Sequence, residues 1–353
     1  MKVVQLGPFP PPHGGVATNV VAIHRALLDR GDDAYVVNIT GTRRASTDRV
    51  RYPNGVLELV KILLRMRPDV LHLHIGGRMT SRLKALCLLC TAVPRARTVL
   101  TLHSGGYAHA SAGKPIRRFS TAGLIFRRFD RVVVVNEQMQ RMFEAFGVAP
   151  DRIRLITPFS DSSAAVHGSN GGATLPRALE DFCAEHEPLL ATIGALEPEY
   201  DLDFQIRCLP EIAKSWPNVG LLVIGDGSQR QSAHEALTRA GVANRVMLCG
   251  DVPHEITLQA IARAAAVLRT TRYDGDSIAV REAIAAGTPV VATDNGMRPS
   301  GTELFRIGDG PDFLRALGRA LENGRQDRSQ SLLASTTRGG AEAILDLYAE
   351  LQA

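Results

Sequence analysis

The sequence predicts an α/β protein made of two doubly wound domains, each a parallel sheet with helices on both faces. Three observations support this fold class: the length of 353 residues, the alternation of short apolar runs with helical stretches, and a break and restart of that alternation near the middle. A chain of this length exceeds one ordinary core and suits two domains of about 150 residues each. Short apolar strands separated by helices are typical of parallel sheets covered on both sides.

The first half alternates regularly between the two kinds of segment. Strands are predicted at residues 2–7, 34–38, 69–75, 97–103, 131–136 and 153–158, and helices at residues 16–29, 55–66, 79–91, 116–129 and 137–147. The strand segments are rich in Val, Leu and Ile, which favour a buried pleated surface. Residues 1–160 are therefore predicted as the N-terminal domain.

The alternation then stops and resumes. Residues 161–187 are rich in Ser, Gly and Ala and are predicted as a linker that ends in a short helix over 176–184. New strands are predicted at 189–195, 220–227, 246–252, 265–271 and 289–293, with helices such as 204–216 and 254–264 between them. Residues 188–338 are thus a second α/β domain, and an amphipathic helix within 339–353 ends the chain. We expect the two domains to face a central cleft.

Composition and cysteine content restrict the class of protein. Hydrophobic residues make up 45% and charged residues 22%, which is typical of a globular chain, and no apolar run approaches the roughly 18–20 residues that span a bilayer. The five cysteines are scattered, which favours a reducing, cytoplasmic location. Cys87 and Cys90 are expected to be core thiols, with a metal or redox role as the alternative.

The charge is divided unevenly between the halves. Residues 1–160 contain 24 Lys and Arg against 10 Asp and Glu, whereas the remainder contains 17 against 26, giving +14 and −9. Residues 113–131 carry basic pairs around Phe119, Phe126 and Phe129, a composition typical of an interfacial helix. We therefore expect the N-terminal domain to contact an anionic membrane surface, with a solvated basic face as the alternative. No nucleic-acid-binding motif is present, so nucleic acid is not an expected partner.

Two motifs of the N-terminal domain follow strands. Gly14 and Gly15 lie between the first strand and the first helix, where backbone N–H groups can approach a phosphate or a sugar; an ordinary tight turn is the alternative. His103 ends a strand, and its imidazole can hydrogen-bond a sugar hydroxyl or a reacting phosphate oxygen, so it is a catalytic candidate. His72 and His74 share one face of another strand and are expected to be buried histidines rather than metal ligands.

The most informative segment runs from Asp274 to Glu282. A strand leads into the turn YDGD, and a helix is predicted to begin at Ile278 with Ser277 as its N-cap. The amides of that helix start form an anion site. Glu282, about one turn into the helix, can accept hydrogen bonds from the vicinal hydroxyls of a ribose, and Asp274 can accept one from a hexose. An exposed turn followed by a solvated helix face is the alternative.

This segment resembles the signature of the retaining GT-B glycosyltransferases of family 4, in which two acidic residues separated by seven others precede an A-x-G-x-P-V-V-A-T tail. Asp274 stands where the first is usually Glu, and Glu282 matches the second. The positions of Gly14–Gly15, His103 and VIGDG (223–227) also match the family. The resemblance implies a GT-B fold whose final helix crosses back to the N-terminal domain.

The same resemblance implies the chemistry. It indicates transfer of a hexose, with retention of configuration, from a nucleoside diphosphate sugar (UDP or GDP) to a glycan or lipid-linked acceptor, in surface polysaccharide or glycolipid biosynthesis. No metal and no other cofactor is expected. The protein would work in the cytoplasm, at the inner face of the membrane.

One departure from the family pattern concerns the diphosphate. Family members carry an Arg and a Lys after the first strand of the second domain, and here Ala195 and Tyr200 occupy those positions. Each charge-assisted bond to a diphosphate contributes roughly 1.5–3 kcal/mol. Arg272 is the expected substitute, with Arg281 and Arg298 as further candidates. The departure leaves two alternatives open: a catalytically degenerate GT-B protein acting as a binding or partner subunit, or a GT-B enzyme with an unusual donor.

Overall fold

The computed structural model describes residues 1–40, 44–77, 79–103, 105–107, 118–158, 175–324 and 337–353. The chain divides into two units. Unit 1 comprises Met1–Pro11, Gly15–Ser160 and Thr337–Ala353, and unit 2 comprises Pro12–Gly14 and Asp161–Thr336. The last helix therefore belongs to the unit in which the chain begins. Most of the predicted linker, up to residue 174, lies outside the described residues.

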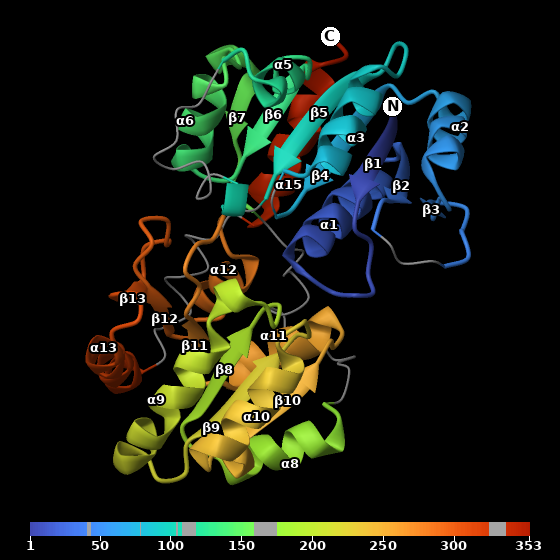
Figure 1. Ribbon diagram of the computed structural model, residues 1–353. Coiled ribbons are helices and arrows are strands. Elements are labelled where there is room, and N and C mark those ends of the chain that lie inside the picture. Colours follow the sequence, from blue (N-terminus) through green and yellow to red (C-terminus); the bar gives the residue numbers. More distant parts are fainter. Residues whose placement is uncertain (41–43, 78, 104, 108–117, 159–174, 325–336) are drawn as a thin grey trace. The chain divides into compact units, whose positions relative to one another are not determined.

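Unit 1 contains a seven-stranded parallel sheet with the order β3-β2-β1-β4-β5-β6-β7 (Figure 1). Its strands are β1 (Lys2–Gly7), β2 (Asp33–Asn38), β3 (Val50–Arg51), β4 (Val70–Ile75), β5 (Arg97–Leu102), β6 (Arg131–Val134) and β7 (Ile153–Leu155). Its helices are α1 (Gly15–Asp29), α2 (Val56–Met66), α3 (Ser81–Thr91), α5 (Thr121–Phe126), α6 (Glu137–Ala145) and α15 (Thr337–Glu350).

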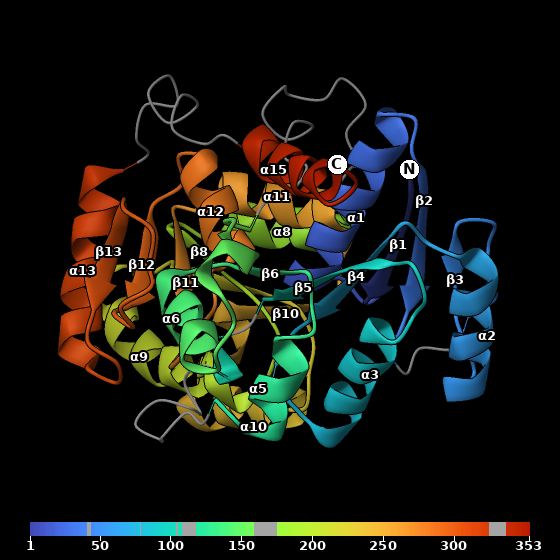
Figure 2. The ribbon, with the colours of Figure 1, turned by 90° about the horizontal axis from the view of Figure 1, so that it is seen from above.

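The period-2 alternation of the strands gives this sheet two apolar faces. One face packs against α2, α3, α5 and α6. The opposite face packs against α1 and α15, which lie side by side in Figure 2. Leu345 and Tyr348 of α15, and Leu351 directly after it, are buried there with Val3, and these contacts attach the end of the chain to unit 1.

Unit 2 contains a six-stranded parallel sheet with the order β10-β9-β8-β11-β12-β13. Its strands are β8 (Leu189–Ile193), β9 (Gly220–Ile224), β10 (Val246–Gly250), β11 (Ala266–Arg269), β12 (Val290–Thr293) and β13 (Thr302–Phe305). Its helices are α8 (Arg177–Glu185), α9 (Leu202–Ser215), α10 (Arg230–Ala240), α11 (His254–Arg263), α12 (Ile278–Ala285) and α13 (Gly310–Asn323).

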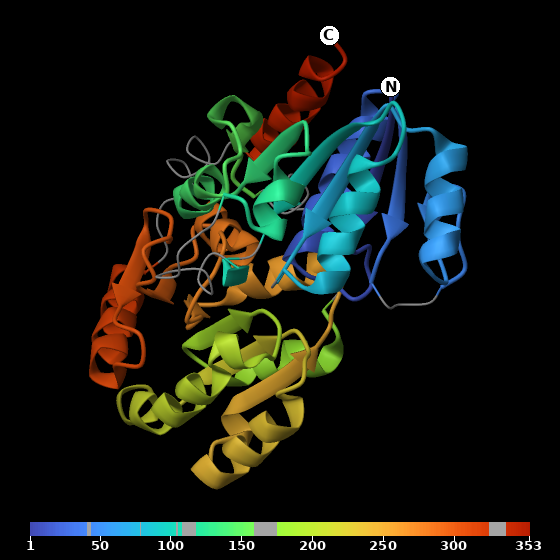
Figure 3. The ribbon, with the colours of Figure 1, turned by 45° about the horizontal axis from the view of Figure 1, so that its top comes forward.

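Helices cover both faces of this second sheet as well. Helices α9, α10 and α13 enclose one hydrophobic cluster with the sheet, and Figure 3 shows α9 and α10 together on that side. Helices α8, α11 and α12 enclose the other cluster. The predicted α/β class, with two parallel sheets each covered on both faces, is therefore confirmed.

Two short strands and the extent of one helix differ most from the sequence prediction. Strands β3 and β13 were not expected, because a two-residue strand and the half-exposed TELF carry no clear apolar run. The helix predicted over 116–129 is only α5, Thr121–Phe126, and residues 108–117 lie outside the described part of the chain.

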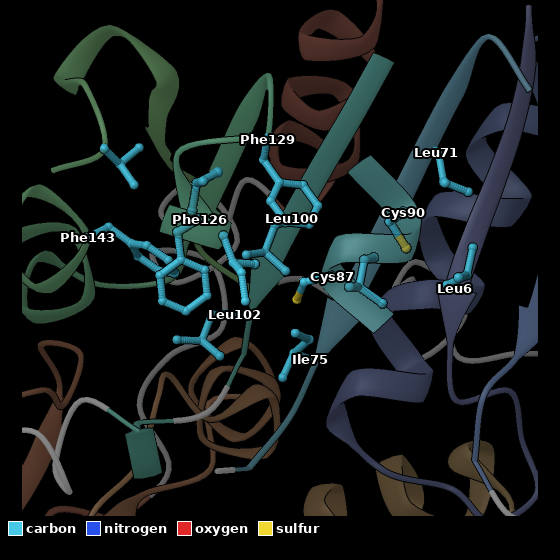
Figure 4. Close-up of a cluster of buried hydrophobic side chains, with 14 of the residues drawn as sticks. Leu6, Leu71, Ile75, Cys87, Cys90, Leu100, Leu102, Phe126, Phe129 and Phe143 are labelled. Atoms are coloured by element: carbon cyan, nitrogen blue, oxygen red, sulfur yellow. The ribbon is translucent and has the colours of Figure 1, made fainter. Parts of the chain in front are cut away.

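The shorter helix corrects the predicted interfacial surface. Phe126 and Phe129 are 1% and 0% exposed and pack in the core beside Cys87 (Figure 4), whereas Phe119 is 81% exposed. Two of the three aromatic side chains assigned to a membrane are therefore core residues. Cys87 and Cys90 are buried free thiols, as expected, and burial raises the pKa of Cys87 to about 12. Within the described residues, every helix is too short or too polar to cross a membrane.

We predict that Phe126→Ala lowers the free energy of unfolding by about 3–5 kcal/mol, because it removes a buried ring and leaves a cavity. Phe119→Ala is the matched control and should change the unfolding free energy by less than about 0.5 kcal/mol. Chemical denaturation of the full chain measures both values. Equal effects of the two substitutions would contradict the assignment of Phe126 to the core.

Candidate functional site

The predicted donor-binding residues of unit 2 lie where its central strands end. Strands β8, β11 and β12 are neighbours in the sheet and run parallel, so their carboxyl ends meet at one edge. Gly194 follows β8, Asp274 follows β11, and Arg298 follows β12. This is the edge at which doubly wound sheets bind ligands.

Helix α12 begins as the sequence predicted. The Ser277 hydroxyl accepts a hydrogen bond from the Val280 N–H at 3.4 Å, and Ile278 is the first helical residue. The N–H groups of the first turn have no partner within the helix, and they give its start a partial positive charge. The first turn contains no acidic residue to neutralise that charge. The helix start is therefore suited to an anion such as a phosphate.

Glu282 is held by a histidine that the sequence analysis did not identify. Its side chain is 5% exposed, and its Oε1 lies 2.7 Å from Nε2 of His254, the first residue of α11. The pairing fixes one carboxylate oxygen and leaves Oε2 for a second contact. Glu282 thus has the orientation of a positioned acceptor rather than of a solvated helix residue. His254 carries no sequence signal, because only the packing of α11 against α12 brings it to Glu282.

Asp274 is the centre of a buried ionic network. Its Oδ2 accepts from Arg269 Nε at 2.9 Å, Arg269 Nη2 at 2.8 Å, Arg298 Nη1 at 3.0 Å and Thr271 Oγ1 at 3.2 Å, and its Oδ1 accepts from the Gly275 N–H. The two arginine side chains are 8% and 3% exposed. A hexose hydroxyl could use only the remaining acceptor capacity of Oδ1.

The network sets the charge of Asp274. Burial alone would raise the pKa of this carboxyl, but the charges of Arg269 and Arg298 and their hydrogen bonds hold it below its ordinary value. Asp274 is therefore ionised at neutral pH. Two cations surround one anion, so the network keeps one net positive charge at the strand ends.

Arg269 also places a positive charge close to positions 195 and 200, where the family pattern has Arg and Lys. Its Nη1 donates to the Ile193 carbonyl at 2.8 Å, and its guanidinium lies 4.8 Å from the centroid of the Tyr200 ring. A Cβ on Gly194 would stand 2.3 Å from that ring and 3.0 Å from Arg269 Nη1. An arginine from β11 thus places its charge beside Gly194, next to Ala195. Sequence reading missed it because Arg269 counts as an interior position of a buried strand.

The three arginines named from the sequence all have acidic partners. Arg272 Nε donates to Asp201 at 3.2 Å, and Arg281 pairs with Asp276. Arg272 is the most accessible, at 61% exposure, against 33% for Arg281 and 3% for Arg298. Arg272 therefore stays the predicted substitute for the missing diphosphate cations, while Arg298 is part of the buried network.

The remaining predicted residues lie at the start of α1 and at the end of β5. Gly15 is the first residue of α1, and among the described residues no atom lies within 4 Å of a Cβ built on Gly14. His103 directly follows β5, and its Nε2 lies 3.0 Å from Nδ1 of His74. Burial lowers the pKa of His103 to about 4, so the ring is neutral near pH 7. Among the described residues, no group of three or more His, Cys, Asp or Glu is arranged to hold a metal ion.

Two family models match successive parts of the chain. The model described as Glycosyltransferase Family 4 matches residues 13–163, and the model described as Glycosyl transferases group 1 matches residues 187–323. The boundary between the two matches falls between the two sheets. The first model therefore covers most of unit 1 and the second most of unit 2, and both models describe glycosyltransferases.

Similar proteins point the same way. A D-inositol 3-phosphate glycosyltransferase of Nocardia farcinica is 28% identical over 72% of this chain and 60% of its own length. The chain thus spans less than two thirds of that relative. A lipopolysaccharide core biosynthesis glycosyltransferase of Rhizobium meliloti is 24% identical over 88% of this chain and 82% of its own length. The structure of Anabaena HepE in complex with UDP has a TM-score of 0.65 at 18% identity, covering 99% of this chain and 97% of HepE.

We predict that Asp274→Asn lowers the free energy of unfolding by about 3–5 kcal/mol, because it leaves two buried guanidinium groups without their anion. Since the pKa of Asp274 is lowered in the folded protein, its contribution is present above about pH 4 and is lost as the pH falls further. Asp201→Asn, which removes the partner of the exposed Arg272, should cost at most about 1 kcal/mol. Denaturant titrations at pH 7 and pH 3.5 measure both effects, and equal losses for the two variants would refute the network.

Proposed function

The chain belongs to the GT-B glycosyltransferases of the family 4 type, and on this basis we propose that it transfers a hexose from a nucleoside diphosphate sugar to a hydroxyl of a glycan or lipid-linked acceptor. UDP and GDP are the nucleotides proposed for the donor. The donor site is assigned to the strand ends of unit 2, with Ser277, Ile278 and Glu282 as its centre.

One observation carries this proposal: a helix start whose first amides have no backbone partner within the helix and a fixed carboxylate lie one helical turn apart on α12. The amides of the first turn suit a phosphate, and the Glu282 carboxylate suits the vicinal hydroxyls of a ribose. A nucleoside diphosphate presents both groups at a comparable spacing. The net positive charge of the network around Asp274 adds a favourable field for the diphosphate.

The proposed reaction exchanges one bond for another. The bond between the sugar C1 and the diphosphate oxygen breaks, and its electron pair stays on the leaving diphosphate. A new bond forms between C1 and the acceptor oxygen, whose proton passes to the leaving phosphate oxygen. Charge therefore builds on the phosphate, where the α12 amides, the Gly14–Gly15 loop and Arg272 would stabilise it. His103 and Asp274 are proposed to orient the sugar.

The finer assignments rest on resemblance. Retention of configuration and a hexose donor are proposed from the family pattern alone. The proposed role in surface polysaccharide or glycolipid biosynthesis is supported by the Rhizobium relative, which is named for lipopolysaccharide core biosynthesis. The proposed location is the cytoplasm, at the inner face of the membrane. Burial of Phe126 and Phe129 leaves only the basic charge of residues 1–160 and the exposed Phe119 to support membrane contact.

A second function is favoured by one feature, the absence of cations at positions 195 and 200. Tyr200 is stacked under Arg269, and Ala195 has no charged group. A catalytically degenerate subunit would still bind a nucleotide through α12 but would not cleave a donor. An enzyme with an unusual donor would cleave only a sugar outside the common panel.

Turnover of a donor panel distinguishes these functions. We expect the purified chain to release nucleoside diphosphate from at least one UDP- or GDP-linked hexose, and faster when a glycan or lipid acceptor is added. A coupled assay of nucleoside diphosphate release measures this. Nucleotide binding without release from any donor would favour the degenerate subunit, and neither binding nor release would refute the transferase.

We predict that Glu282 provides selectivity for the ribose hydroxyls. The unchanged protein should bind UDP or GDP about tenfold or more tightly than the corresponding 2′-deoxynucleotide, since a hydrogen bond to a charged group contributes about 1.5–3 kcal/mol. Glu282→Gln should remove most of this difference. Glu303→Gln, which alters a carboxylate on β13 paired with Arg319, is the control and should preserve it. Calorimetric titration measures the affinities; undiminished selectivity in Glu282→Gln would contradict the ribose assignment.

A further inference from the structure

One face of the unit 1 sheet changes from apolar to polar along its strands. At the strand starts this face carries Val3, Val70 and Val99, which pack against α1 and α15. The positions that follow on the same face by the period of 2 are Gln5 on β1, His72 and His74 on β4, and Thr101 and His103 at the end of β5. Gln5, His72 and His74 are at most 2% exposed. Buried polar groups of this kind require hydrogen-bond partners. A partner that can only accept determines which atom of the buried group carries the hydrogen.

The direction of the hydrogen bonds can be followed from a backbone carbonyl. The Val20 carbonyl can only accept, so the group facing it at 3.3 Å is the Gln5 amide nitrogen. The Gln5 oxygen Oε1 therefore faces His74 Nε2, at 3.1 Å. An amide oxygen can only accept as well. His74 must consequently carry its hydrogen on Nε2.

The same reasoning extends from His74 to His103. Burial holds the pKa of His74 well below its ordinary value, so the ring is neutral and has a single hydrogen. Its Nδ1 is then a bare acceptor, and the group 3.0 Å away, His103 Nε2, must donate to it. His103 is itself neutral near pH 7. Its second nitrogen, Nδ1, is left without a hydrogen and has no hydrogen-bond partner among the described residues.

We propose that Gln5 and His74 are positioning residues that fix His103 in its Nε2–H form, so that its Nδ1 is presented to substrate purely as a hydrogen-bond acceptor. This deepens the proposed function and rests on it where substrate is concerned. An acceptor nitrogen can receive a hydrogen bond from a sugar hydroxyl. It cannot donate to a phosphate or carbonyl oxygen, so of the two partners that the sequence allowed for His103, the relay selects the hydroxyl.

His72 provides a matched control within the same strand. It is buried like His74, and the two rings lie 3.9 Å apart between centroids. Its nitrogens face Tyr348 Oη and Thr101 Oγ1, each at 2.6 Å. Both partners are hydroxyls, which donate or accept equally well, so they impose no direction. His72 makes no hydrogen bond to His103.

The first test reads the tautomer directly and needs no activity. Long-range proton–nitrogen-15 spectra of the full chain, labelled at histidine, report which ring nitrogen carries hydrogen, and His103→Gln assigns the signals. At pH 7 we expect the pattern of the Nε2–H form for His103. In His74→Leu this pattern should move toward the average of two exchanging tautomers, whereas in His72→Leu it should stay. An Nδ1–H or doubly protonated His103 in the unchanged protein would overturn the proposal.

The second test uses the kinetics of donor cleavage. His74→Leu should lower kcat/KM for the donor by about tenfold, and His74→Asn, whose oxygen can stand in for Nδ1 as acceptor, should recover most of the loss. Gln5→Leu is a milder second variant, expected to loosen the His103 tautomer in the same direction. Equal rates in His74→Leu and His74→Asn would overturn the relay. The spectra decide the tautomer even when no donor is turned over, so failure of the proposed function and failure of the relay are distinguishable.

Discussion

The buried carboxylate of Asp274 ties together the strand ends on which the donor site of unit 2 depends. A charge at this depth is costly without compensation, and two guanidinium groups from different segments supply it. Arg269 reaches from β11 to the carbonyl that ends β8, and Arg298 reaches from the loop after β12 to Thr293 and Thr271. The loops after three adjacent strands are therefore fixed by one ion cluster. Helix α12 begins four residues after Asp274, so the cluster positions the start of this helix. The helix in turn positions Ser277 and Glu282.

In unit 1 the buried polar groups at the strand ends are compensated without charge. Its polar face at the ends of β1, β4 and β5 consists of neutral imidazole, amide and hydroxyl groups that satisfy one another. Burial favours neutral histidine because the charged form loses its hydration. The neutral network fixes which of its atoms donate and which accept hydrogen bonds. The ionic network instead leaves a net positive charge. The first suits recognition of hydroxyl groups, and the second suits recognition of an anion.

The sequence was sufficient for features that local physics determines. Apolar runs defined nearly all of the strands, and the Ser277 cap and the start of α12 followed from residue types in short windows. Strands β3 and β13 were missed because their residues form no clear apolar run. The helix predicted over 116–129 was too long, since within the described residues it is only α5, Thr121–Phe126. The partners Arg269 and His254 could not be found from spacing alone, since contacts across strands and helices bring them to Asp274 and Glu282. A charged residue within an otherwise apolar predicted strand, residues 265–271, was the one available signal for Arg269.

The departure at Ala195 and Tyr200 can now be stated as a difference in how charge is arranged. In the family pattern two cations stand free for the diphosphate. Here Arg269 lies beside Gly194 and Ala195, but its charge is partly neutralised by the ion pair with Asp274. One face of its guanidinium group is covered by the Tyr200 ring. A diphosphate bound at these strand ends would meet about one net positive charge from the network, together with the amide dipoles of α12 and the exposed Arg272. Donor affinity would then depend more on directed hydrogen bonds, including those to the ribose, than on ion pairing. Such a site should lose less affinity with rising salt than one built on two free cations, because screening weakens charges and leaves hydrogen-bond geometry in place.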